Sequence, residues 1–364
     1  MQKMTRRFAT AVLAMTTALT PACGQSTNRS DQGLAGGSKI DPGTVIPSCT
    51  AATGTQPGPQ VPSYVDEPIE QLKKMVPGLS GIKIEGVRNA SAGTPTAPVQ
   101  DKTTFILNRT SAVIAGLFHR MPNLIAKEEV KEPTDTEMKN DLPRRGGGGW
   151  IASTQQRIPI THFKTSVYTY RIVHKQTPAD GDTVDEFRTD AHDQPIDDSA
   201  HNAQRPVSVG FANTWLFFFP GNLQQSRFRY LGVQKIGNRE TYVLAFAQNP
   251  VHLGVRVVLG SRYGPCSTSI QGVAWIDQST FQIVRTQTDL LTPLPGIQVN
   301  QLRSNLEYGA VRIRALDLTL WLPAKVDIQW QTESRAGEET HLYSHYKLFQ
   351  STARILPADE SPAP

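Results

Sequence analysis

The feature that most constrains this chain is a series of alternating apolar and polar segments between Arg227 and Phe349. They form pairs that flank short turns: residues 227–236 and 239–247 around Gly237-Asn238, 271–276 and 281–290 around 277–280, 301–308 and 311–318 around Gly309-Ala310, and 323–332 and 339–349 around 333–338. An apolar residue at every second position is typical of strands with one buried face, and short turns join antiparallel neighbours. The sequence therefore predicts an antiparallel meander whose apolar face needs a cover.

Helices that could cover this sheet are predicted upstream, at residues 67–76 and 103–119. In the longer one, apolar residues recur at helical spacing, while its polar face has too few lysines and arginines for a membrane-surface helix. Further strands are expected at residues 124–130, 164–174 and 183–189, and the dense apolar stretch 209–219 indicates a short buried helix. The predicted fold class is mainly β (α+β), a sheet with one or two packing helices.

The N-terminus has the order of a secretory signal peptide. Residues 1–22 begin with basic residues, continue through the apolar run Phe8–Leu19 and end in small residues. The run is too short to span a bilayer, which takes about 20 residues. Two alternatives remain for Cys23: lipidation at a lipoprotein processing site, or plain cleavage before it. Membrane association is expected only through an N-terminal lipid, if Cys23 is acylated.

The domain boundaries follow from composition. Residues 23–63 are rich in Gly, Ser, Thr, Pro and Gln, so ordering them would cost entropy without burial to offset it. We expect a disordered tether there, a single β-rich globular domain at residues 64–355, and a disordered tail at 356–364. The protein would be exported to the periplasm, anchored at the outer membrane, or extracellular.

The charge balance gives no reason to expect a nucleic acid partner. The net charge is +5, but three basic residues lie in the leader, and their removal leaves 34 basic against 32 acidic residues. Phosphate binding needs a clustered basic face.

Cysteines and histidines indicate no cofactor. An oxidising compartment would permit a disulfide between Cys49 and Cys266, and the absence of a Cys-x-x-Cys pair argues against a thiolate zinc site. His341 and His345 lie four apart on a predicted strand and should face one side, but no third metal ligand is evident.

Other polar groups are expected to be structural. The acidic loop around Asp190 and Asp193 indicates a solvated turn, and Asp277 is expected to pair with Arg285 across a hairpin. No Gly-x-Ser-x-Gly motif occurs, so we predict no catalytic, cofactor-binding or metal residue.

Several segments resemble an uncharacterised family of exported bacterial envelope proteins. The segments are Gln271–Asp277 followed by Phe281–Arg285, Arg229–Gly232, Tyr242–Gln248, Trp321-Leu322-Pro323 and His341–Phe349. The Trp-x-Asp strand and the later Leu-Pro strand are also distantly similar to the LolA/LolB/RseB-like lipoprotein-carrier half-barrel group. That resemblance implies a curved antiparallel sheet, or half-barrel, that is closed on its concave side by helices and can hold acyl chains.

The leading hypothesis is a non-enzymatic envelope binding protein that holds lipid or a lipidated peptide in an apolar cleft of the half-barrel. The aromatics expected to line either the core or such a cleft include Tyr242, Phe246, Trp275, Phe281 and Trp321. Two alternatives remain: a structural or regulatory envelope protein that acts through protein–protein contacts, and an unrecognised hydrolase.

Overall fold

A computed structural model of the chain describes residue 54 and residues 62–84, 99–140, 157–177, 181–194, 211–249, 257–259, 266–332 and 336–349. The predicted signal peptide, the lipidation residue Cys23, Cys49, most of the tether and the C-terminal tail lie outside these residues. Cys266 begins a short strand, but its side chain is not among those described. The lipidation, the disulfide and the domain boundaries therefore stay predictions.

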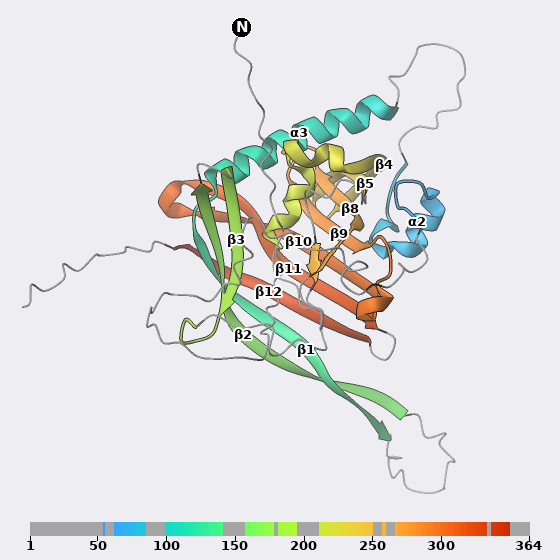
Figure 1. The fold of residues 1–364 in the computed structure, drawn as a ribbon, viewed down its shortest axis with the longest axis vertical. Coiled ribbons are helices and arrows are strands. Elements are labelled where there is room, and N and C mark those ends of the chain that lie inside the picture. The colour runs from blue at the N-terminus through green and yellow to red at the C-terminus, as the bar shows by residue number, and fades with distance from the viewer. Residues whose placement is uncertain are drawn as a thin grey trace, which may run out of the picture.

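The chain is mainly β, as predicted: one curved, open antiparallel sheet of ten strands in the order β3-β2-β1-β12-β11-β10-β9-β8-β5-β4 (Figure 1). The strands are β1 (Leu124–Asn140), β2 (Arg157–Thr177), β3 (Gly181–Thr189), β4 (Ser226–Ile236), β5 (Arg239–Gln248), β8 (Ile270–Asp277), β9 (Ile283–Leu290), β10 (Val299–Ile313), β11 (Leu318–Thr332) and β12 (Ala336–Leu348). A separate pair, β6 (Val257–Leu259) and β7 (Cys266–Thr268), lies between β5 and β8 in sequence.

Two meanders make up the sheet. Strands β4, β5, β8, β9, β10, β11 and β12 are neighbours in chain order, which confirms the predicted meander between Arg227 and Phe349, and β1, β2 and β3 form a second meander. The two meanders are joined where β1 pairs with β12, for example Val130 with His341. Because β3 and β4 lie at opposite edges of the sheet, the chain crosses over between the two meanders.

One predicted turn is wrong. Gly309-Ala310 lies inside β10, which runs on to Ile313, and the chain reverses at Asp317, whose φ of 45° is left-handed. The ladder shifts register just before the glycine: Glu307 pairs with Lys325 and Tyr308 with Pro323, so the extra residue lies on β11. Gly309 and Ala310 then continue the ladder opposite Leu322 and Trp321 and form no turn.

Each face of the sheet is traced by a row of directly paired residues, because partners in an antiparallel ladder share a face. The row that defines the inner face reads Tyr230, Leu244, Ala274, Thr286, Leu306, Val326, His341, Val130 and Ser166. The row that defines the outer face reads Val243, Trp275, Arg285, Glu307, Lys325, Leu342, Glu129 and Val167.

Helical segments cover the inner face. The expected helix at 103–119 spans Val99–Arg120 (α3), and the apolar stretch 209–219 contains the 3₁₀ helix η2 (Ala212–Phe218), followed by η3 (Pro220–Gln225). Helix α3 contacts β4, η2 and η3. Figure 1 shows η2 and η3, in yellow, between α3 and the strands.

A second segment, residues 62–84, covers the outer face at the β4 end. It contains α2 (Ile69–Met75, within the predicted 67–76) and the 3₁₀ helix η1 (Pro77–Leu79), and it buries Leu72, Val76 and Leu79. None of the described helices is long and apolar enough to cross a membrane.

Candidate functional site

Four aromatic side chains gather where the N-terminal half of α3 crosses the sheet. Phe105 of α3 contacts Phe281 edge to face at 5.8 Å between ring centroids, Phe281 lies 6.1 Å from Tyr242, and Tyr242 lies 6.2 Å from Tyr230. We call these four residues the α3 aromatic cluster. Phe105 keeps 48% of its surface exposed, so the cluster reaches the protein surface.

Phe281 occupies a backbone conformation that phenylalanine rarely adopts. Its φ is 56°, at the end of the β8–β9 turn, where its N–H donates to the Asp277 carbonyl at 2.9 Å. Left-handed angles cost a residue with a Cβ about 1–2 kcal/mol, and such outliers concentrate at functional sites. The chain therefore carries an aromatic ring where glycine would be less strained.

Two cations border the α3 aromatic cluster. The Lys102 ammonium lies 4.7 Å from the Tyr230 ring centroid and 5.6 Å from that of Tyr242. The Arg109 guanidinium lies 5.8 Å from Phe105 and 5.9 Å from Phe281. Partial burial lowers the pKa of Lys102. The cluster thus combines apolar area with positive charge.

The segment η2 fills the inner face further along the sheet. Phe217 and Phe218 both lie 5.5 Å from Phe246, and Trp215 lies 5.5 Å from Tyr308. The Phe246 ring can lie flat on β8 because its neighbour is Gly272, where an added Cβ would come within 2.7 Å of that ring. Phe246 is therefore packed beneath η2 in this structure.

Trp275 lies on the opposite face. It is fully buried, its Nε1 donates to Gln234 at 3.0 Å, and the Gln234 amide donates to the Gly78 carbonyl at 2.8 Å. The Arg285 guanidinium lies 5.0 Å from its ring. Residues 62–84 thus cover this side chain.

Of the five aromatics proposed to line a cleft, Tyr242 and Phe281 are in contact. Phe246 lies four residues after Tyr242 on β5 and therefore on the same face of the sheet. Trp275 is separated from them by the thickness of the sheet. Trp321 lies under the Arg239 guanidinium, 4.5 Å from its centroid.

A buried ionic cluster lies on the inner face at the seam of the two meanders. Glu128 on β1 accepts two hydrogen bonds from Arg188 on β3, at 2.5 and 2.7 Å, and one from the Tyr343 hydroxyl on β12 at 2.7 Å. The His341 Nδ1 atom lies 2.8 Å from the same carboxylate. We call Glu128, Arg188, Glu339, His341 and Tyr343 the ionic cluster.

The ionic cluster has two polar atoms without a hydrogen-bond partner. They are Nε2 of His341 and Oε1 of Glu339, in side chains that are 1% and 4% exposed. The His341 Nε2 atom lies 3.6 Å from Glu339 Oε2. Protonated His341 would face carboxylates through both ring nitrogens.

Electrostatics keeps the cluster charged. Burial raises the pKa of Glu128, but Arg188 and His341 outweigh burial and lower that pKa to about 2. Burial lowers the pKa of His341, but the hydrogen bond to Glu128 and the nearby Glu339 carboxylate outweigh burial, so the pKa is raised overall. Phe211 packs on both His341 and Tyr343. The ionic cluster is therefore covered, and its charged groups contact one another.

Sequence reasoning did not find this cluster, because its members are far apart in the chain. One signal was present: Glu128 occupies the apolar register of its strand, after Leu124 and Ala126 and before Val130, all of which are buried. A carboxylate at such a position needs a charged partner.

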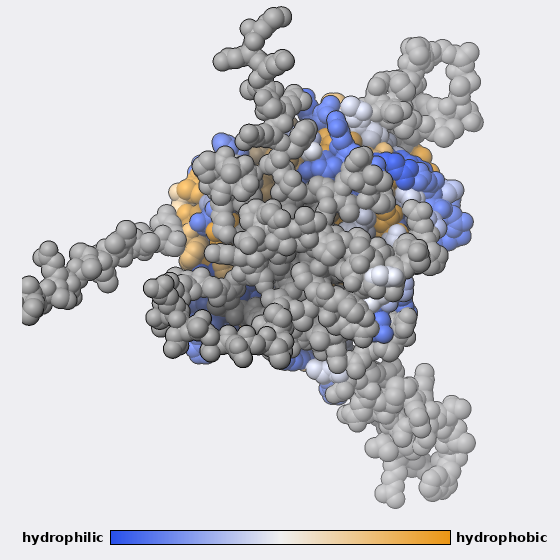
Figure 2. Space-filling view, viewed as in Figure 1, coloured by the Kyte–Doolittle hydropathy of each residue, from blue (hydrophilic) through white to orange (hydrophobic). Residues whose placement is uncertain are grey.

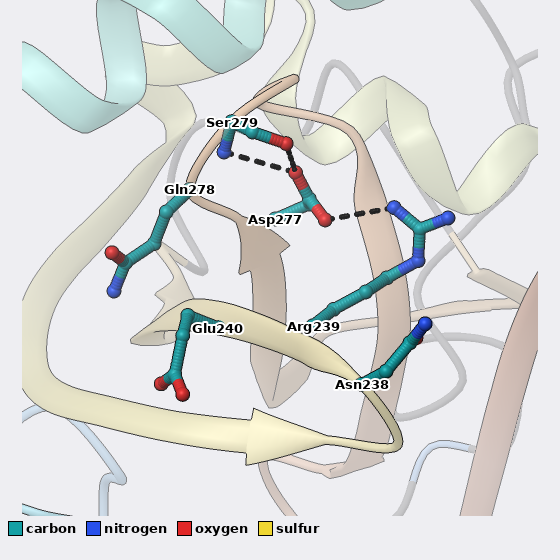
Figure 3. A pocket seen from close by; sticks show the side chains of 6 residues that line it. All are labelled: Asn238, Arg239, Glu240, Asp277, Gln278 and Ser279. Atoms are coloured by element: carbon teal, nitrogen blue, oxygen red, sulfur yellow. Dashed lines mark hydrogen bonds and ion pairs between the residues drawn. The ribbon is translucent and has the colours of Figure 1, made fainter.

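A shallow polar depression lies at the ends of the β4–β5 and β8–β9 hairpins (Figure 3). It has a volume of about 280 Å³. Asp277 accepts hydrogen bonds from Ser279 and Thr280 and pairs with Arg239 at 2.9 Å. Burial raises the pKa of Asp277, but these bonds lower it to about 2. The predicted Asp277–Arg285 pair is wrong, because Arg285 stacks on Trp275 on the outer face.

The histidine prediction is also wrong in one respect. His341 faces inward, but His345 is exposed and has a φ of 57°, next to a register shift between β1 and β12. The shift breaks the alternation, so the two do not share a side. Within the described part of the chain, no group of three His, Cys, Asp or Glu side chains could hold a metal. The turn at Asp190–Gln194 is exposed, as predicted, and Asp190 accepts backbone bonds from His192 and Gln194.

No protein-family model and no curated protein matches this sequence. Among solved structures, the chain is similar to an outer membrane lipoprotein-sorting protein domain from Vibrio parahaemolyticus, described as putative, with 11% identity, 70% of this chain and 94% of that chain covered, and a TM-score of 0.35. It is also similar to a DUF1329 family protein from Desulfovibrio piger, with 9% identity, 71% and 96% coverage, and a TM-score of 0.32.

Because both TM-scores are low, the fold class rests on the strand order and the pairing registers of this chain itself.

Proposed function

We propose that the protein is an exported, non-enzymatic envelope protein that binds an acyl chain between the N-terminal half of α3 and the inner face of the sheet. The ligand would be a lipid or a lipidated peptide. Acylation of Cys23 would tether the protein to a membrane, and the preceding segment would be its export signal.

The observation that carries this proposal is the α3 aromatic cluster. Tyr242 and Phe281 come from different hairpins and contact each other, and Phe281 lies against Phe105 of α3, which is exposed at the surface. An acyl chain that replaces water on these rings gains about 25 cal/mol for each Å² of apolar area buried.

The two halves of α3 are held differently, which suggests where a ligand enters. The C-terminal half packs Phe118 on Trp215 and Phe219, at 6.2 and 5.8 Å. In the N-terminal half, Thr103 accepts a hydrogen bond of 3.3 Å from the Tyr230 N–H, and Lys102 lies on the Tyr230 ring. This half also packs Phe105 on Phe281 and buries Ile106. Lifting the N-terminal half would open the space beside Tyr242 and leave the packing on η2 intact.

Titration with a fluorescent long-chain fatty acid tests the proposal. We expect one saturable site per chain, and Phe281→Gly should weaken it at least tenfold, because this variant removes a ring and relieves backbone strain. The matched control is Gln298→Gly, another exposed left-handed position, with a φ of 60°. Equal binding by both variants, or no saturable binding by the native protein, would contradict the proposal.

The ionic cluster supports a second candidate, a hydrolase, only in that polar groups from three strands converge there. Its carboxylates and guanidinium are bonded to one another under Phe211. We therefore assign the cluster to holding the two meanders together.

A further inference from the structure

We propose that the surface around the N-terminal half of α3 docks on a bilayer that contains anionic lipids. The docking patch consists of Lys83, Ile84, Lys102, Phe105 and Arg109. This inference rests on the proposed function, because it places the acyl-binding cluster against the membrane from which an acyl chain would come.

Two exposed side chains form the apolar part of the patch. One is Ile84, which follows the residue paired with β4, and the other is Phe105 of α3. Ile84 is 53% exposed and Phe105 is 48% exposed. Residues 83 and 84 lie against Gly232, whose φ of 145° and missing Cβ allow Lys83 to pair with Val233. Phe105 lies on the far side of the cluster that includes Tyr230, two residues earlier on β4.

The charged part of the patch comes from two separate segments. Lys83 precedes Ile84 directly, whereas Lys102 and Arg109 flank Phe105 on α3. Figure 2 shows hydrophilic and apolar residues intermixed over the upper part of the molecule, where α3 crosses. The helix sequence alone has too few cations for a membrane-surface helix, and the fold supplies the missing one from residues 62–84.

This combination matches the chemistry of an anionic interface. Each lysine or arginine near such a surface contributes about 1 kcal/mol, and exposed aromatic or aliphatic side chains insert between the headgroups. The opposite side of the molecule offers a comparison, because Phe163 on β2 is 57% exposed and Lys131 on β1 is also exposed.

Vesicle co-sedimentation tests the docking patch. The exported chain should carry Cys23→Ser, so that no acyl group supplies the affinity, and the vesicles should be phosphatidylglycerol with phosphatidylethanolamine, or phosphatidylcholine alone. We expect binding to the anionic vesicles that falls with added salt, and a loss of about tenfold in Phe105→Ser and in Arg109→Glu. The matched controls, Phe163→Ser and Lys131→Glu, should bind like the parent chain.

Several results would overturn the inference. They are equal losses in patch and control variants, no binding by the parent chain, or a dimer that Phe105→Ser dissociates while vesicle binding stays unchanged. The outcome is separable from the acyl-binding proposal, since Lys83→Glu changes a patch residue outside the α3 aromatic cluster. This variant should weaken vesicle binding and still bind the soluble fatty acid. Fatty-acid binding without vesicle binding would remove only the docking patch.

Discussion

The two ends of the sheet reach stability by different means. At the β4–β9 end both faces are covered, and Val243 and Trp275 on the outer row are fully buried. At the β1–β3 end the described residues cover only the inner face, and Val167 at the other end of the same row is 53% exposed. The inner face there carries the ionic cluster. Apolar packing on two faces stabilises the β4–β9 end, and the buried ionic cluster on one face stabilises the β1–β3 end.

This difference explains the sequence patterns. Strand β8 is buried at every position, as in sheets covered on both faces, whereas β1 alternates from Leu124 to Val130. In the half that is covered on one face, the buried ionic cluster connects β1, β3 and β12. Strands that share no hairpin are joined there by Glu128, Arg188 and Tyr343.

The largest expected effect is at the doubly covered end. Trp275→Ala should lower the free energy of unfolding by about 4 kcal/mol, because it leaves a cavity beneath Gly78 and removes the donor to the Gln234 side-chain oxygen. Urea unfolding measures this. Val167→Ala, on the same outer row, should change stability by less than about 0.5 kcal/mol. Similar losses in the two variants would show that the outer face is not divided as described.

The next largest loss of stability is expected in the ionic cluster. Glu128→Gln should cost about 3 kcal/mol, because it removes the buried charge that accepts two hydrogen bonds from the Arg188 guanidinium. Its neighbour Glu129 lies on the outer face and pairs with Lys127, so Glu129→Gln is the matched control and should be close to neutral. A neutral Glu128→Gln would show that the ionic cluster does not hold the seam.

The ionic cluster should also make the free energy of unfolding depend on pH. Folding raises the pKa of His341 above its ordinary value of 6.5, so its contribution is complete below about pH 6.5 and is lost as pH rises through the folded pKa. The charged and titratable groups that face it are Glu128, Arg188, Glu339 and Tyr343. Stability measured by urea unfolding should fall on the alkaline side, and His341→Gln should flatten this slope. A slope that His341→Gln leaves unchanged would refute the assignment.

Glu128 should act at the other end of the pH scale. Its pKa is lowered from 4.5 to about 2 on folding, so its contribution is present above pH 4.5 and is lost as pH falls toward 2. The alkaline and acid losses therefore have different origins in one cluster.

The smallest expected change in stability is at the α3 aromatic cluster. Phe281→Gly loses ring contacts but relieves a left-handed backbone, so stability should change by less than about 1 kcal/mol while fatty-acid binding falls. Thermal unfolding measures the first quantity. A large loss of stability would mean that the Phe281 ring is a core element and not part of an adaptable surface.

Much of the sheet could be predicted from the sequence because its hairpins are local. Gly237-Asn238 joins β4 and β5 at the expected place. The predicted Gly309-Ala310 turn failed because the β10–β11 ladder continues through both residues to Ile313, and a register shift between β1 and β12 turned His345 away from His341. Periodicity cannot reveal bulges, since one extra residue leaves the local composition unchanged.

The candidate sites were less predictable, because they join distant segments. Tyr242 and Phe281 were named as aromatics, but only the fold shows that Phe105 contacts Phe281 and that Trp275 lies on the opposite face. The pairing of Glu128 with Arg188 and His341 spans 60 and 213 positions of sequence. No local pattern carries such a contact.

Hydrogen exchange along α3 is the sharpest test of an acyl site between the N-terminal half of this helix and the sheet. We expect backbone amides of Lys102–Arg109 to exchange faster than those of Ile114–Arg120 in the ligand-free protein. A long-chain fatty acid should slow exchange in the first set selectively. Uniform exchange along the helix that the fatty acid leaves unchanged would contradict an acyl site beneath the N-terminal half of α3.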